Sequence, residues 1–247
     1  MHPHVIIFDL DGTLAASKQP LDSEMPGLLT RLLEQHYVCV ISGGSFDQFQ
    51  KQFLSSLDTP KESLARLILL PTSGASLYYH TDTWHKKYEE TIAPEDASRI
   101  LALLDEAHIR FEYELNTPYG PSIENRGTQI TLSPLGQHAP VALKEPWDPS
   151  QEKRRAIVSY LQPLLPEFTI TIGGMTSIDI TQKGVDKSYG IQKIAEHLNL
   201  PISEMLFVGD ALYEGGNDYP ARKSGITCHQ VADVSETKQL ITTLLSS

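Results

Sequence analysis

The sequence contains few cysteines, which argues against a fold held together by disulfide bonds. Only Cys39 and Cys228 occur among its 247 residues, and both lie in apolar runs that we interpret as strands. A disulfide framework needs more cysteines in a shorter chain. Buried, reduced thiols are the usual state of cysteine in such runs, and they are typical of a cytoplasmic protein.

A long apolar run is also missing. The apolar stretch near the start covers only Val5–Phe8 and leads directly into acidic residues, so it does not indicate a signal peptide. No run approaches the roughly 18–20 apolar residues that a transmembrane helix requires. We therefore expect a cytoplasmic protein that has no membrane partner.

The chain lacks a stripe of basic residues. It has 20 Lys and Arg against 31 Asp and Glu, so the formal net charge is −11. Nucleic-acid-binding surfaces need clustered Lys and Arg, so we expect no nucleic-acid partner. The one basic run, Lys153-Arg154-Arg155, is interpreted as the solvated face of a helix. A phosphate site on so acidic a protein needs a cation or a few well-placed basic groups.

The hydrophobic patterns at the two ends of the chain predict an α/β fold. Val5–Phe8 and Tyr37–Ile41 are short apolar runs typical of buried strands, and residues 22–35 carry one apolar helical stripe. This order favours parallel strands joined by helical crossovers. The same alternation returns near the end, with a helix at 187–198, strands at 205–208 and 226–230, and a helix at 236–245.

The middle of the chain has a different pattern. Hairpin turns are indicated by Asn125-Arg126-Gly127 and by Gly173-Gly174. Strands are predicted at 111–115, 122–124, 129–133, 169–172 and 176–180, and helices at 94–107 and 149–161. We therefore predict a Rossmann-like parallel-sheet core, residues 1–82 and 186–247, with an inserted α+β cap domain, residues 84–184. Trp84 and Trp147 are interpreted as packing residues of the cap.

The sharpest motif is Asp9-Leu10-Asp11-Gly12-Thr13, directly after a buried strand. Two carboxylates at such a position are costly unless a cation or hydrogen bonds hold them. Asp9 can attack phosphorus to form an aspartyl-phosphate, and Asp11 can act first as general acid and then as general base. Gly12 allows a sharp turn, and the Thr13 hydroxyl can hold Asp9. The alternative is an acidic turn without chemistry.

Two further signals suit a phosphoryl group. Ser42-Gly43-Gly44 ends a strand and offers a hydroxyl and unhindered backbone N–H groups, which makes Ser42 and Gly43 candidate phosphate-binding residues. Lys187 begins a helix and can neutralise both a phosphate and the Asp9 carboxylate. Taken alone, the first segment is an ordinary turn and the second an ordinary surface lysine.

A last pair of acids predicts a metal site. Asp210 follows the strand at 205–208, and Asp218 follows soon after in Gly215-Gly216-Asn217-Asp218. Because Mg²⁺ prefers hard oxygen ligands, we expect Asp9, Asp210 and the backbone carbonyl of Asp11 to bind it, with Asp218 completing the site. All these signals lie where strands end or helices begin, the edge at which open α/β sheets bind ligands.

This ordered set of motifs resembles the haloacid dehalogenase superfamily of phosphoaspartate enzymes, and the large insert resembles its α/β-capped branch. A closer similarity, to the eukaryotic-type phosphomannomutases, extends over nearly the whole chain. It is carried by residues 123–126, 133–136, 172–174, 184–187 and 209–218. The resemblance implies that Arg126, Ser177 and Asp179 of the cap bind a phosphosugar, and it allows a homodimer through the cap. A solvated arginine in a hairpin turn is the alternative for Arg126.

Three residues depart from the phosphomannomutase pattern. Gln137 and Lys144 stand in the cap where arginines are expected, and Lys18 replaces an arginine of the core. A mutase must retain a bisphosphorylated intermediate, which requires strong contacts to the distal phosphate. Gln137 removes a charge, and lysine does not reproduce the bidentate contacts of arginine. These departures favour hydrolysis.

We therefore predict a Mg²⁺-dependent phosphotransferase that acts on a small phosphorylated metabolite bound between core and cap. The first interpretation is a sugar-phosphate phosphatase, and the alternative is a phosphomannomutase. A catalytically silent phosphosugar-binding module is a remote alternative, because Asp9, Asp11, Lys187 and Asp210 are all present.

Overall fold

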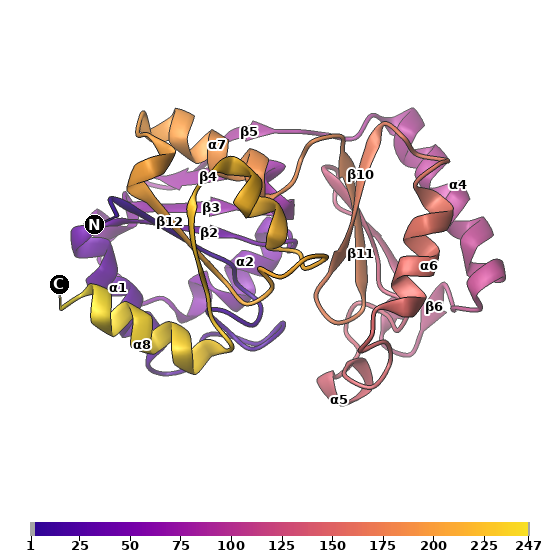
Figure 1. The fold of residues 1–247 in the computed structure, drawn as a ribbon, viewed down its shortest axis with the longest axis horizontal. Helices are drawn as coiled ribbons and strands as arrows, with labels where there is room; N and C mark the ends of the chain where they lie inside the picture. Colours follow the sequence, from indigo (N-terminus) through magenta and orange to yellow (C-terminus); the bar gives the residue numbers. More distant parts are fainter. Residues whose placement is uncertain (1–2, 247) are drawn as a thin grey trace. The chain divides into compact units, whose positions relative to one another are not determined.

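The computed structural model describes residues 3–246, and the chain divides into two compact units (Figure 1). The first unit, the core, runs to Glu89 and resumes at Asp186, and the second, the cap, comprises Glu90–Val185. Residues 84–89, which were expected in the cap, form strand β5 (Trp84–Glu89) of the core sheet. Trp84 accordingly packs in the core, against Phe46 and His80.

The core is built on a seven-stranded sheet with the order β13-β12-β1-β2-β3-β4-β5. Five neighbouring strands are parallel: β13 (Thr227–Gln230), β12 (Met205–Gly209), β1 (Val5–Phe8), β2 (Tyr37–Ile41) and β3 (Leu67–Leu70). Four of them were predicted, and β3 was not identified from the sequence. β4 (Ser76–His80) and β5 continue the sheet as antiparallel strands, which the sequence analysis did not identify.

The register of the parallel strands determines which residues share the functional edge. Phe8, the last residue of β1, lies opposite Val208 of β12 and Val40 of β2. Val40 in turn lies opposite Leu69 of β3. The segments that leave these strands, beginning with Asp9 after β1, therefore emerge at one edge of the sheet, where open α/β folds bind their ligands.

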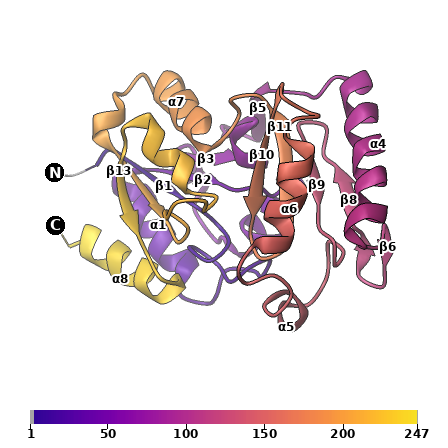
Figure 2. The same cartoon turned by 45° about the vertical axis from the view of Figure 1, so that its right-hand side comes forward.

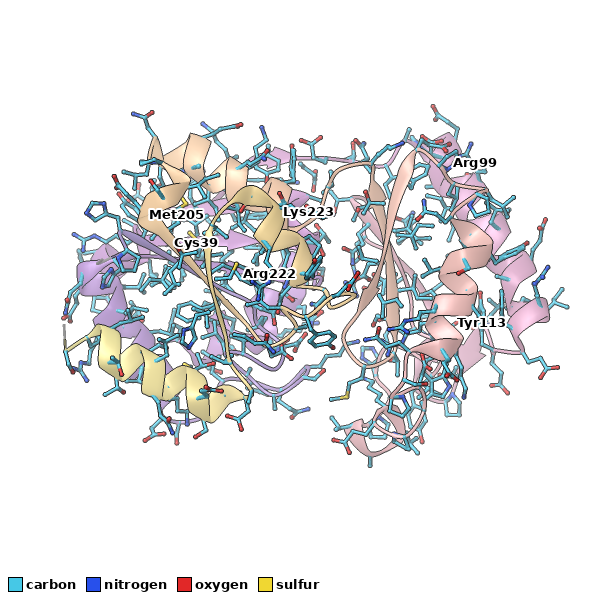
Figure 3. All side chains as sticks on the ribbon, viewed as in Figure 1. Cys39, Arg99, Tyr113, Met205, Arg222 and Lys223 are labelled. Carbon is cyan, nitrogen blue, oxygen red and sulfur yellow. The ribbon has the colours of Figure 1, made fainter. Side chains whose placement is uncertain are left out.

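Both faces of the parallel sheet are covered by helices, which explains why its strands are continuous apolar runs. Ile6 and Phe8 face a layer formed by α1 (Met25–Gln35), α2 (Phe46–Gln52) and α8 (Val234–Leu244). Val5 and Ile7 face α7 (Lys187–Leu198) on the other side, in the same layer as the buried Cys39 (Figure 3). Cys39 and Cys228 are free thiols, as expected.

Helix α7 begins at its predicted residue because the preceding side chain caps it. The Asp186 carboxylate accepts hydrogen bonds from the backbone N–H groups of Ser188 and Tyr189, which have no partner inside the helix. Lys187 is therefore held in the first helical turn. The remaining short helices of the core are η1 (Leu54–Ser56), α3 (Lys61–Leu64), η2 (Thr72–Gly74), η3 (Ile202–Glu204) and η4 (Tyr219–Ser224).

The cap is an antiparallel sheet with helices on one face. Its strands have the order β10 (Phe168–Gly173), β11 (Ser177–Gln182), β9 (Gln129–Leu132) and β8 (Ile123–Asn125). Ile130, Ile178 and Ile180 point to the face covered by α4 (Pro94–Phe111) and α6 (Glu152–Leu161) (Figure 2). The two predicted hairpins, β8–β9 and β10–β11, are confirmed. The cap also contains β6 (Asn116–Thr117), β7 (Gly120–Pro121) and α5 (Val141–Lys144).

Two predictions about the cap are wrong. The segment 111–115 is not a strand, because α4 continues through Phe111 and ends at Glu112, whose backbone is left-handed. Arg154 does not belong to a solvated face, since it is only 2% exposed. Its guanidinium donates to the Asp148 carboxylate at 2.9 Å and to the carbonyl of Gly174 at 2.8 Å. Arg154 thereby ties α6 to the β10–β11 turn.

Within residues 3–246, none of the helices has both the length and the apolar character that crossing a bilayer demands.

Replacing Asp148 with alanine should destabilise the cap by about 3–5 kcal/mol, because Arg154 then remains buried without its counter-charge. The two tryptophans lie in different units, so Trp147 fluorescence reports the cap alone in a Trp84→Phe background. Urea unfolding of this variant with and without Asp148→Ala measures the effect. The control is Arg155→Ala, an exposed arginine of the same helix, which should change the stability by less than about 0.5 kcal/mol. Equal effects of the two substitutions would contradict the role given to the buried pair.

Candidate active site

Asp9 is the centre of the site. It directly follows β1, and its backbone N–H continues the sheet by donating to the carbonyl of Val208 at 2.9 Å. Its side chain is buried, and the Lys187 ammonium donates to Oδ1 at 2.5 Å. The second oxygen, Oδ2, has no hydrogen-bond partner among the described residues. A buried carboxylate oxygen without a partner is costly, so this atom is a candidate for binding a cation.

Three carboxylates converge at this point. One oxygen from each of Asp9, Asp210 and Asp218 lies within 4.8 Å of the others. Lys187 also forms an ion pair with Asp218, whose second oxygen accepts a hydrogen bond from the Ala211 backbone at 2.9 Å. The structure therefore brings together acids that follow β1 and β12 with the lysine that begins α7.

Burial governs the electrostatics of this cluster. It raises the pKa of Asp9 well above the ordinary value, with Asp218 and Asp210 adding to the rise and Lys187 opposing it. Burial and the nearby Asp218 raise the pKa of Asp210 to about 6. For Lys187, burial alone would lower the pKa, but Asp218 and Asp9 outweigh it and the net shift is upward. Lys187 stays charged and offsets only part of the negative charge.

The residues present fit a divalent metal ion. They supply hard carboxylate oxygens, the ligands that Mg²⁺ prefers, and one of these oxygens has no hydrogen-bond partner within residues 3–246. The carboxylate of Asp11 is not part of the cluster, and the contribution predicted for that residue is its backbone carbonyl. Of the predicted metal ligands, Asp9, Asp210 and Asp218 are therefore the ones whose side chains the structure brings together.

The turn after Asp9 requires glycine. Gly12 has a φ of +95°, and a Cβ atom there would lie 2.6 Å from Oδ2 of Asp210. Any other residue would push this carboxylate out of the cluster. The next residue, Thr13, has a different partner from the one expected, since its hydroxyl donates to Asp210 at 3.5 Å rather than holding Asp9.

Asp11 is oriented by groups that the sequence did not reveal. Its Oδ1 accepts hydrogen bonds from the Lys18 backbone at 2.6 Å and from the Gln52 amide at 2.8 Å. Gln48 in turn donates to Gln52 at 3.0 Å. The only sign of this role in the sequence is that Gln52 is a polar residue on the apolar side of α2. The sequence alone cannot connect it with Asp11.

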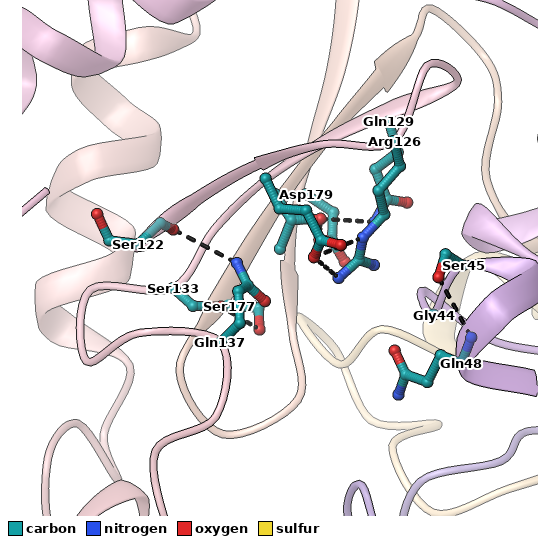
Figure 4. A network of polar contacts seen from close by, with 12 residues as sticks. Gly44, Ser45, Gln48, Ser122, Arg126, Gln129, Ser133, Gln137, Ser177 and Asp179 are labelled. Carbon is teal, nitrogen blue, oxygen red and sulfur yellow. Dashed lines mark hydrogen bonds and ion pairs between the residues drawn. The ribbon is translucent and has the colours of Figure 1, made fainter. Parts of the chain in front are cut away.

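Ser42 lies at the same sheet edge, directly after β2. It is buried, and its hydroxyl accepts a hydrogen bond from the Gly44 backbone at 3.3 Å. Ser45 then caps α2 by accepting from the backbone N–H of Gln48 (Figure 4). The segment at 42–44 therefore forms a compact turn, here named the Ser42 turn, between β2 and α2. Its role in binding phosphate, and that of Gly43, remain predictions.

The predicted cap residues lie on the polar face of the cap sheet. Asp179 lies opposite Thr131, which donates to its Oδ1 at 2.8 Å. Arg126 points toward Asp179 (Figure 4) and forms an ion pair with Glu124 through two nitrogens, at 3.0 and 2.6 Å. Because only 8% of its side chain is exposed, the alternative of a solvated hairpin arginine is wrong.

A second polar group of the cap surrounds Gln137. The hydroxyls of Ser133 and Ser177 share a hydrogen bond of 3.2 Å, and Ser133 also contacts the Gln137 amide at 3.5 Å. The Gln137 side chain is buried and reaches the Ser122 carbonyl (Figure 4). Lys144 is buried in α5. The structure thus gathers the predicted cap residues in one unit, while Lys18 belongs to the core.

Comparison with known proteins identifies the family. A model of the haloacid dehalogenase-like hydrolases matches residues 6–220, which include Asp9, Lys187, Asp210 and Asp218. The chain belongs to this family. The predicted resemblance is confirmed, and membership makes the chain an enzyme.

Relatives of known sequence share the chain over almost its full length. The phosphomannomutase of Spinacia oleracea is 25% identical over 247 residues, covering 96% of this chain and 94% of that protein. The phosphomannomutase of Triticum aestivum is 27% identical over 248 residues, covering 94% and 92%. The similarity to phosphomannomutases is therefore also confirmed.

Solved structures show the same α/β fold. A haloacid dehalogenase-like hydrolase from Bacteroides thetaiotaomicron superposes with a TM-score of 0.66 at 16% identity, covering 98% of this chain and 99% of that one. A C-terminally truncated IMP-nucleotidase of Plasmodium falciparum gives a TM-score of 0.74 at 16% identity, covering 99% and 71%. The predicted fold class is confirmed.

Mg²⁺ should stabilise the protein through the acidic cluster. At a concentration one hundred times the dissociation constant, a ligand of the folded state adds about 2.7 kcal/mol to the free energy of unfolding. We expect thermal unfolding to show this gain in the wild type, and to lose most of it in Asp9→Asn and Asp210→Asn. The control is Asp82→Asn, an exposed acid of the core, which should respond to Mg²⁺ like the wild type. An undiminished response in both cluster variants would place the ion elsewhere.

Proposed function

We propose that this enzyme is a Mg²⁺-dependent sugar-phosphate phosphatase that forms a phosphoaspartate on Asp9. The observation that carries the proposal is the state of the buried Asp9 carboxylate. One of its oxygens is paired with Lys187, and the other has no hydrogen-bond partner in the part of the chain that the structure describes. When bound, Mg²⁺ supplies the positive charge that keeps such a carboxylate ionised and offsets the charge of a phosphate.

The residues of the core account for both halves of the reaction. In the first half, an oxygen of Asp9 forms a bond to phosphorus while the bond between phosphorus and the sugar oxygen breaks. Asp11 gives its proton to that departing oxygen. In the second half, Asp11 takes a proton from water, the water oxygen bonds to phosphorus, and Asp9 is released with inorganic phosphate. Lys187 and the Ser42 turn hold the phosphoryl oxygens throughout.

Hydrogen bonds within the core keep Asp11 ready for this role. The Gln52 amide and the Lys18 backbone N–H both bind Oδ1, which leaves the other oxygen to carry the proton. A fixed orientation matters because a general acid must lie within hydrogen-bonding reach of the atom that it protonates.

The cap supports a small phosphosugar as substrate. The polar face of its sheet carries four kinds of polar group: the hydroxyl of Ser177, the amide of Gln137, the carboxylate of Asp179 and the guanidinium of Arg126. Such a mixture suits the hydroxyls and the phosphate of a sugar phosphate. The sequence relatives named phosphomannomutases point to the same substrate class.

Phosphomannomutase activity is the second candidate, and the relatives favour it. Against it stands the charge of the cap. Gln137 is neutral and is engaged with Ser133 and Ser122, so it adds no positive charge for a second phosphate. Lys144 and Lys18 cannot make the bidentate contacts of arginine. Water is therefore favoured over a sugar hydroxyl as the second acceptor.

A cytoplasmic location is part of the proposal and is supported by the two free thiols, which are typical of a reducing compartment. Dimerisation through the cap stays a prediction.

The nucleophile can be tested by replacing Asp9. With sugar phosphates and Mg²⁺, the wild type should release inorganic phosphate, and Asp9→Asn should lower kcat at least about a thousandfold because the amide cannot attack phosphorus. Circular dichroism checks that the variant is folded. Asp82→Asn serves again as the control and should keep wild-type activity. Equal rates for Asp9→Asn and the wild type would refute the mechanism.

The second acceptor can be identified from the products of mannose 1-phosphate. We expect free mannose and phosphate, both without additions and with a catalytic amount of mannose 1,6-bisphosphate to phosphorylate Asp9. Phosphorus NMR resolves the products. Accumulation of mannose 6-phosphate as the main product would instead establish the mutase.

A further inference from the structure

The segment after β3 has an unusual backbone. Residues 71–75, here named the 71–75 turn, contain three consecutive residues with positive φ: Thr72 at +50°, Ser73 at +59° and Gly74 at +94°. Positive φ is uncommon outside glycine, and for a β-branched residue such as Thr72 it is an outlier. Strain of this kind persists only where the surrounding structure imposes it, and it clusters at functional sites.

The strained backbone directs two N–H groups at the Ser42 turn. The Thr72 N–H donates to the carbonyl of Gly44 at 2.9 Å, and the Ser73 N–H donates to the carbonyl of Ser42 at 2.8 Å. Since φ and ψ of Thr72 set the direction of the Ser73 N–H, helical or extended backbone at Thr72 would turn that group away from Ser42. Within the 71–75 turn itself, the carbonyl of Gly74 accepts a hydrogen bond from the Tyr88 hydroxyl at 2.6 Å, which anchors the turn to β5.

The other side of the 71–75 turn packs directly against α7. A Cβ atom on Gly74 would lie 2.8 Å from Cα of Gly190, and one on Gly190 would lie 3.2 Å from Cα of Gly74. The two backbones therefore touch without any side chain between them. Gly190 lies about one helical turn beyond Lys187, so the contact fixes the part of α7 that carries the lysine.

We propose that the 71–75 turn is a positioning element of the active site, which sets the separation between the Ser42 turn and Lys187. The inference rests on the proposed function, in which these two groups hold the same phosphoryl oxygens. They come from distant parts of the chain, and the turn contacts both of their elements. The rigid, left-handed backbone of the turn restricts each of these two elements to one position.

A methyl group at the contact with α7 tests the proposal. In Gly74→Ala, the 2.8 Å approach must open to at least the 3.4 Å of an ordinary contact, which displaces α7 and Lys187 from the Ser42 turn. Small misplacements of reacting groups can cost up to about a hundredfold in rate, so we expect kcat to fall at least about tenfold with little change in KM.

Gly225→Ala is the matched control. Gly225 has a φ of +82°, and a Cβ atom there would meet nothing within 4 Å, so the substitution strains the backbone in the same way without moving α7. Both variants should lose thermal stability, but only Gly74→Ala should lose kcat. If Gly74→Ala keeps kcat within about twofold of Gly225→Ala, the turn has only a structural role and the proposal is overturned.

A second pair of variants approaches the contact from the helix. Gly190→Ala also crowds the junction, where its Cβ would lie 2.5 Å from Ile41 and 3.2 Å from Gly74, whereas Gly27→Ala in α1 meets nothing within 4 Å. We expect kcat to fall in the first and to remain unchanged in the second. If Gly74→Ala does not fold, the comparison of Gly190→Ala with Gly27→Ala tests the positioning role by itself.

Binding of orthovanadate with Mg²⁺, measured by calorimetry, separates this inference from the proposed function. If the wild type binds vanadate but hydrolyses no sugar phosphate, the proposed function fails. Even then, the positioning role is supported if Gly74→Ala binds vanadate at least tenfold more weakly than Gly225→Ala, by the same argument about misplaced groups. Equal affinities of the two variants overturn it. If the wild type binds no vanadate, both proposals fall.

Discussion

The ammonium group of Lys187, buried between Asp9 and Asp218, is the interaction on which the site depends. Each of these three charges would be costly in the interior without the others, because burial disfavours every ionised group. One lysine cannot balance three carboxylates, since Asp210 joins the same cluster. The remaining negative charge favours the binding of a divalent ion. The same electrostatic argument therefore accounts for the composition of the cluster and for the proposed cofactor.

The fold supplies this interaction through three separate elements. Parallel pairing of β1 with β12 brings Asp9 and the 210–218 loop to one edge, and the Asp186 cap starts α7 where Lys187 can reach both acids. The contact of Gly74 with Gly190 then fixes how far α7 stands from the strand ends. A polar site with this many buried charges tolerates little displacement, and the position of Lys187 accordingly depends on backbone contacts and a helix cap.

The sequence was sufficient to predict four of the five parallel strands of the core, because strands buried on both faces, such as β1 and β2, are continuous apolar runs that end at their chemistry-bearing residues. The fifth, β3, was not identified. The sequence also did not reveal β5, whose segment Trp84–Glu89 is mostly polar and mostly exposed. The partners of Arg154 and Thr13 were misjudged for another reason. A local pattern shows that a residue lies on a helix or turn, but not that the Gly174 carbonyl or the Asp210 carboxylate lies opposite. Gln52 was missed for the same reason.

In the proposed reaction, the residues of the core bear on the transfer of the phosphoryl group to aspartate, and the residues of the cap bear on the choice of the second acceptor. The chemistry proposed for Asp9, Asp11 and Lys187 suits a phosphatase and a mutase alike, because both would begin with the transfer of a phosphoryl group to aspartate. They differ in whether the departing sugar is retained long enough to accept that group again. Retention needs positive charge in the cap for a second phosphate, and Gln137 contributes hydrogen bonds to Ser133 and Ser122 in place of a charge. Under the proposed function, a sugar phosphate that meets fewer positive groups in the cap leaves more readily than a bisphosphate held by several arginines, and the phosphoaspartate then reacts with water.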